Sequence, residues 1–114
     1  MAIRYHIALP DPEKARGSDP ALSFRSHGAD GLAAELQDAL RGNTLFNRWR
    51  GQQEDPDEVD PALGATDPDA TVEGSQHDLH IDLVAVSSIP GAVLRHRLRL
   101  LAGNGWELRD VSNA

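Results

Sequence analysis

The stretch QHDLHIDL at positions 76–83 is the part of the chain whose residue types and spacing could do chemistry. Imidazole and carboxylate groups together suit zinc, manganese or iron, and the same groups can act as an acid/base pair. The candidate metal ligands are His80 and Asp82, with His6 from a neighbouring strand. Short His/Asp spacings also occur often without function. We therefore favour a solvated sheet face on which Arg4 and other arginines pair with the carboxylates.

The spacing of apolar residues around this stretch predicts a β-strand. From residue 77 to 86, apolar and polar positions alternate, which is typical of one half-buried strand. In such a strand Asp78, His80 and Asp82 share one face, about 7 Å apart at each step, and His77 lies on the opposite face. The predicted strand therefore separates His77 from the candidate site.

The motif RHRLR at positions 95–99 is a second candidate site. We expect a helix here, with Arg95 and Arg99 on one face and Arg97 nearer the flank of the apolar stripe. The functional interpretation is an anion-binding or nucleic-acid-binding surface formed by the three arginines. The competing interpretation is a helix whose polar face is merely basic, because no stacking aromatics or glycine-rich loop accompany the arginines.

Three valines form a third candidate site. Val84, Val86 and Val111 fall on positions that should face water on the uncovered side of the predicted sheet. Exposed apolar patches tend to mark contacts, so these residues predict a subunit or partner interface. The alternative is that the N-terminus or the loop at 10–20 covers them.

The elements that must position these residues form an α+β pattern. One helix between the last two strands predicts a right-handed βαβ unit with parallel strands. The pattern favours a two-layer sandwich of about four strands with two helices on one face, arranged as a ferredoxin-like split βαβ sheet; a strongly bent sheet or small open barrel is the alternative. The predicted strands are 3–9, 21–26, 77–86 and 106–111, and the predicted helices are 31–41 and 90–102.

The net charge of −7 comes from one segment. Residues 52–70 hold seven acids and no base, and the rest of the chain is neutral. Three Asp-Pro pairs and little apolar content predict a disordered insertion within a single domain that spans residues 1–114. A flexible acidic segment can also lie across the basic helix and screen it.

Composition narrows the class of protein. Only 4% of residues are aromatic, so the core must rest on Leu, Val, Ile and Ala, and oligomerisation often strengthens such a core. The absence of cysteine excludes disulfides, thiolate metal clusters and a cysteine nucleophile. The chain has no apolar run long enough for a membrane span, and its start lacks the pattern of a signal peptide, so we expect a cytoplasmic protein without a membrane partner.

These observations favour a small, non-enzymatic interaction domain that forms a homo-oligomer or binds a protein partner. The first alternative is a nucleic-acid or phosphate-binding module that uses the basic helix and is masked by the acidic segment. The second alternative is a metal-dependent enzyme or metal-binding protein that uses the His/Asp cluster. No dinucleotide, P-loop, zinc-protease or serine-hydrolase motif is present, and we expect no cofactor.

Overall fold

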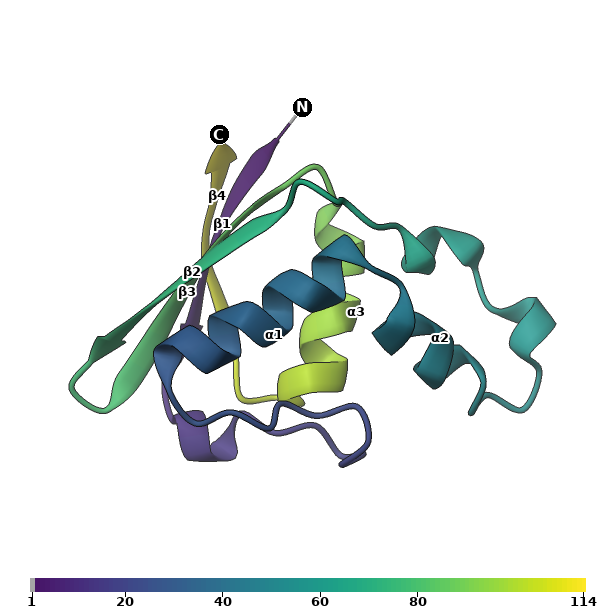
Figure 1. Ribbon diagram of the computed structural model, residues 1–114, viewed down its shortest axis with the longest axis horizontal. Coiled ribbons are helices and arrows are strands. Elements are labelled where there is room, and N and C mark those ends of the chain that lie inside the picture. The colour runs from purple at the N-terminus through teal and green to yellow at the C-terminus, as the bar shows by residue number, and fades with distance from the viewer. Residues whose placement is uncertain (1) are drawn as a thin grey trace.

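The computed structural model describes residues 2–114, and it confirms a two-layer α+β fold built on one open sheet (Figure 1). The sheet has the strand order β2-β3-β1-β4, and every neighbouring pair is antiparallel. This is the ferredoxin-like arrangement of two interleaved βαβ units, and it is not a closed barrel. The strands are β1 (Ile3–Leu9), β2 (Thr71–His77), β3 (His80–Ser87) and β4 (Glu107–Asn113), and the helices are α1 (Ala29–Arg41), α2 (Thr44–Arg50) and α3 (Gly91–Ala102).

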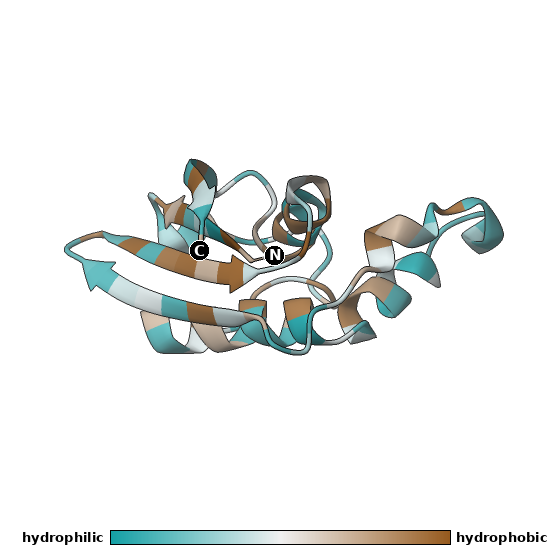
Figure 2. Cartoon of the chain, turned by 90° about the horizontal axis from the view of Figure 1, so that it is seen from above, coloured by the Kyte–Doolittle hydropathy of each residue, from teal (hydrophilic) through white to brown (hydrophobic). Residues whose placement is uncertain are grey.

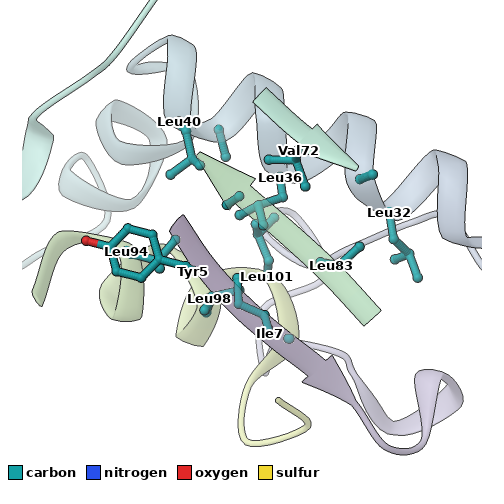
Figure 3. Packing of buried hydrophobic residues seen from close by; sticks show 14 of the residues in the cluster. Tyr5, Ile7, Leu32, Leu36, Leu40, Val72, Leu83, Leu94, Leu98 and Leu101 are labelled. Carbon is teal, nitrogen blue, oxygen red and sulfur yellow. The ribbon is translucent and has the colours of Figure 1, made fainter. Parts of the chain in front are cut away.

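The two long helices cover one face of the sheet. Their leucines recur at helical spacing, which places an apolar stripe against the strands. Figure 3 shows leucines of α1 and α3 converging on side chains of the strands, and nearly all of the core residues are aliphatic. The buried Tyr5 hydroxyl donates a hydrogen bond of 2.6 Å to the carbonyl of Ile89. The expected aromatic-poor core is therefore confirmed.

The predicted relation between the last two strands is confirmed. β3 and β4 do run in the same direction, but β1 lies between them and is antiparallel to both. The α3 crossover therefore skips one strand, which makes the unit a split βαβ rather than a pair of adjacent parallel strands.

The predicted strand at 21–26 is wrong. This segment consists of turns and irregular backbone, although Leu22 and Phe24 are buried as the pattern indicated. Its backbone bonds to the end of α3, because the amide of Phe24 donates to the carbonyl of Leu101 at 2.9 Å. The helix end supplies the acceptor that a sheet partner would otherwise have supplied.

The predicted strand at 77–86 is wrong at its beginning. β2 and β3 form a hairpin, and Asp78 and Leu79 make its two-residue turn. Asp78 has φ of 53°, a left-handed conformation that aspartate tolerates better than most residues, and Leu79 is 87% exposed. Figure 2 shows that β3 is mostly hydrophobic and β2 mostly hydrophilic. The alternation of apolar and polar residues therefore predicted β3 but gave no signal for β2.

The acidic insertion at residues 52–70 lies beyond α2, at the end of the molecule away from the β2–β3 hairpin (Figures 1 and 2). It contains two short 3-10 helices, η2 (Pro56–Glu58) and η3 (Pro61–Gly64). η3 packs against α3, and a Cβ at Gly64 would approach the Phe46 ring to 2.7 Å, so glycine permits the close contact. Disorder of this segment in solution stays a prediction.

Candidate functional site

The uncovered face of the sheet carries the first candidate site. Along β3, four side chains alternate outward from the core and are all half-buried. Strand register places Glu73 of β2 beside Val84, and Arg4 of β1 beside Val86. The two valines thus lie in the second half of β3, toward the end of the sheet where β2 begins, with charged residues on the neighbouring strands. The four outward residues of β3 are His80, Asp82, Val84 and Val86.

Val111 does not join the other two valines. A register shift between His6 and Ile7 of β1 inserts one extra residue into β4, at Arg109. A bulge of this kind sends every following side chain to the other face. Val111 therefore pairs with Tyr5 on the helix side of the sheet, where it is 51% exposed.

The hairpin brings together two histidines that the sequence separated. His77 pairs directly with His80, and their rings stack at a centroid distance of 5.3 Å and an interplanar angle of 21°. Nε2 of each ring lies 3.4 Å from the same oxygen, Oδ2 of Asp82. The predicted strand placed His77 on the opposite face, because no turn was predicted after this residue. The signal for the turn was Asp78, since aspartate adopts the left-handed conformation more readily than most residues.

Ser75 adds a hydroxyl to this cluster. Its Oγ lies 3.0 Å from Nε2 of His77, the same nitrogen that approaches Asp82. A hydroxyl–imidazole–carboxylate relay needs the hydroxyl and the carboxylate on different ring nitrogens. The cluster is therefore a hydrogen-bonded polar group and lacks the geometry of a catalytic triad.

The predicted metal ligands lie around one cavity. His6, His80 and Asp82 line a depression of about 460 Å³ on the uncovered face, together with Ser75 and Arg109. Within residues 2–114, no group of three His, Cys, Asp or Glu side chains is arranged to hold a metal ion. The three residues thus share a cavity without forming a metal centre.

The predicted charge pairing on this face also differs from the structure. Among the ion pairs of the described residues, Asp82 is approached by the two imidazoles and not by Arg4. Arg4 lies beside Val86, four register positions away from Asp82 along the strands. Arg109 does pair with one of the carboxylates, Glu107 of its own strand, at 2.7 Å.

The basic helix splits into two faces. Arg95 and Arg99 are exposed, whereas Arg97 is fully buried at 0% exposure. Arg97 lies four residues from both Val93 and Leu101, which are buried, so its position within the apolar stripe was a signal for burial. Its Nη2 donates a hydrogen bond of 2.8 Å to the carbonyl of Ala65, and desolvation by burial lowers the pKa of Arg97.

His96 lies next to Arg97 and faces α2. Its ring meets the Trp49 ring edge-on at 4.4 Å. Burial lowers the pKa of His96, and the charges of Arg97 and Arg99 lower it further. This histidine therefore favours its neutral form, and it belongs to the packing between α3 and α2 rather than to an exposed basic surface.

Two observations concern the whole chain. Of the helices in the part of the chain that the structure describes, none is long and apolar enough to cross a membrane. Comparisons of the chain with protein-family models, with curated proteins and with solved structures found no match.

Proposed function

We propose that this protein is an interaction domain that self-associates as a two-fold dimer through the uncovered face of its sheet. The observation that carries the proposal is the position of Val84 and Val86, half-buried on an inner strand of a face that no helix covers. Two such faces can pack about 10 Å apart, as in a β-sandwich, and remove the valines from water.

The size of the face suits a reversible dimer. Four strands of about seven residues, spaced by about 4.8 Å and rising by about 3.3 Å per residue, give roughly 400–450 Å² in projection. Stable interfaces bury about 800 Å² of accessible surface per partner, and accessible area exceeds projected area. The face therefore lies at the lower end of the specific range, and we expect a dimer that dissociates at micromolar concentrations.

The charges beside the valines favour a second copy as the partner. Glu73 lies one strand from Val84 on one side, and Arg4 lies one strand from Val86 on the other side. The two charges are thus equally far from the midpoint of the valine pair. A two-fold axis through that midpoint can bring Arg4 of each copy opposite Glu73 of the other, which is the self-complementarity of an isologous interface.

The central substitution tests the interface. Val84→Asp places a carboxylate in the middle of the buried patch, so we expect sedimentation velocity to show a dimer for the wild type and a monomer for the variant at equal concentration. Val111→Asp is the matched control, because Val111 is exposed on the helix side, and it should leave the dimer unchanged. A wild-type chain that sediments as a monomer at about 100 μM contradicts the proposal.

A charge exchange tests the partner and the axis. Arg4→Glu and Glu73→Arg should each weaken the dimer about tenfold, since every dimer contains the pair twice. The double variant Arg4→Glu/Glu73→Arg should regain most of the wild-type affinity. If the double variant is weaker than either single variant, these residues do not face each other across a two-fold axis. A different protein partner and a cytoplasmic location stay predictions from the sequence.

A further inference from the structure

Arg97 is a buried cation without a carboxylate partner. Its side chain is fully buried beneath the acidic insertion, and Nε and Nη1 have no hydrogen-bond partner among the described residues. The insertion holds seven acids, yet it offers Arg97 the neutral carbonyl of Ala65. Native structures rarely leave a buried guanidinium in this condition, because burial of an unpaired charge is costly.

The pattern of free nitrogen atoms defines what Arg97 can still bind. A guanidinium has two edges that can hold an oxyanion with two parallel hydrogen bonds. One edge consists of Nε–H and Nη2–H, and the other consists of Nη1–H and Nη2–H. Nη2 therefore contributes one hydrogen to each edge, and the carbonyl of Ala65 accepts one of these two hydrogens. Because Nε and Nη1 are unpartnered, at least one complete edge of Arg97 stays open for an oxyanion.

A second unpartnered nitrogen atom lies next to Arg97 on the helix, and it is a donor in the tautomer that carries the ring hydrogen on Nδ1. Nδ1 of His96 is also buried and has no hydrogen-bond partner in the described part of the chain. His96 contacts Trp49 of α2, and Arg97 contacts the insertion that follows α2. Two consecutive residues of α3 therefore present buried, unpartnered nitrogen atoms to one covering region, residues 44–65.

We propose that Arg97 and His96 form a binding site for a small phosphate-type oxyanion, and that the acidic insertion covers this site in the closed structure. A tetrahedral oxyanion has enough oxygens to occupy one edge of the guanidinium and the imidazole at once, whereas a carboxylate has two oxygens. A nucleic acid strand fits the site less well, because Arg97 is fully buried and Trp49 already packs on His96.

Opening of the site requires η3 to leave α3, while Asp67 keeps the end of the insertion attached to the loop before α3. η3 is a single short turn, and the side chain of Asp60 caps it by accepting a hydrogen bond of 2.9 Å from the amide of Ala62. Its contact with Arg97 is one hydrogen bond. A ligand that binds only the form in which η3 has left Arg97 binds more weakly when most molecules are closed. A substitution that weakens the attachment of η3 should therefore strengthen the binding of the ligand.

Thermal unfolding of the full chain tests the site, with inorganic phosphate exchanged for chloride at constant ionic strength. The wild type should show a saturable rise in Tm with phosphate. Arg97→Met should lose this rise and should melt without phosphate at or above the wild-type temperature, because the substitution removes a buried charge without a carboxylate partner. Arg95→Met, an exposed arginine of the same helix, should keep the phosphate response.

A second pair of variants tests the cover. Asp60→Ala removes the cap of η3, and we expect its half-saturating phosphate concentration to fall several-fold. Glu54→Ala removes the same charge from the insertion without loss of a cap, and its response should match the wild type. Equal responses of Asp60→Ala and Glu54→Ala contradict the role of the insertion as a cover.

Three results overturn the proposal. In the first, phosphate and chloride give the wild type equal Tm values, or Arg97→Met responds to phosphate as the wild type does. In the second, acetate raises the Tm as much as phosphate, which makes the site a carboxylate site. In the third, a short single-stranded oligonucleotide binds more tightly than phosphate with a steep dependence on salt, which makes the site a nucleic-acid site.

Discussion

The carboxylate of Asp67 fastens the end of the acidic insertion to the loop before α3. Its Oδ2 accepts hydrogen bonds from the amide of Ser88 at 2.9 Å and from the hydroxyl of buried Ser87 at 3.0 Å, and its Oδ1 accepts one from the amide of Asp69 at 3.0 Å. The bond from Ser88 is the largest cause that lowers the pKa of Asp67 below its ordinary value of 3.8, and the bonds from Asp69 and Ser87 act in the same direction against partial desolvation.

Asp67→Ala removes both acceptor oxygens and with them all three hydrogen bonds, and the structure allows the cost to be worked out. The bond from buried Ser87 contributes about 1.5 kcal/mol, and the two bonds near solvent contribute about 0.5 kcal/mol each. We therefore expect the variant to lose about 2–3 kcal/mol of unfolding free energy at neutral pH.

The pH dependence follows from the direction of the pKa shift. The folded pKa of Asp67 lies below its unfolded pKa. The carboxylate thus stabilises the fold fully at pH values above the unfolded pKa, and this contribution is lost as the pH falls through the folded pKa. The difference in stability between wild type and Asp67→Ala should therefore shrink as the pH falls below the unfolded pKa of about 3.9.

Urea denaturation at neutral and acidic pH measures both effects. At neutral pH we expect the midpoint of Asp67→Ala to fall by about 1–2 M. Asp69→Ala is the control, since the exposed Asp69 takes part in this network through its amide, and it should change the midpoint little. A loss under about 0.5 kcal/mol at neutral pH, or a loss of equal size at both pH values, refutes the assigned role of the Asp67 carboxylate.

Two further substitutions test the packing of the sheet. Tyr5→Phe should cost about 1–2 kcal/mol because it leaves the carbonyl of Ile89 unpaired. Burial raises the pKa of Tyr5, so this contribution is present below its unfolded pKa and is lost as the pH rises through the folded pKa, which denaturation above about pH 10 should show. Gly74→Ala should destabilise by more than 1 kcal/mol, because its Cβ would overlap the carbonyl oxygen of Ala29, whereas Gly42→Ala meets only an ordinary contact of 3.8 Å and should be tolerated. Chemical denaturation compares the two glycine variants directly.

The two proposals rest on opposite sides of the sheet and can fail independently. The dimer depends on Val84 and its neighbours on the uncovered face, whereas the anion site depends on Arg97 within the helix layer. We therefore expect Val84→Asp to keep the phosphate response and Arg97→Met to keep the dimer. An effect of either variant on both measurements indicates a change in the fold rather than in one site.

Local periodicity was sufficient to predict much of the fold. α1 and α3 follow from leucines at helical spacing, and β1 and β3 follow from alternating apolar residues, because each pattern records which side of the element meets the core. The same alternation placed Val84 and Val86 on the uncovered face. β2 escaped prediction because it is an edge strand with one buried apolar residue, Val72, and therefore carries little periodicity.

The residues of the candidate sites depended on contacts between distant parts of the chain. Asp78 adopts a left-handed conformation in a turn, so His77 and His80 lie on two paired strands and contact each other. A bulge at Arg109 places Val111 on the helix side of the sheet. The insertion completes the cover of Arg97, whose place in the apolar stripe already indicated burial, and leaves Arg95 and Arg99 exposed. Periodicity reports which face of an element is apolar. A turn, a bulge or a covering segment changes which side chains meet. These features depend on contacts between segments that are distant in the sequence, and the local pattern of apolar residues does not encode such contacts.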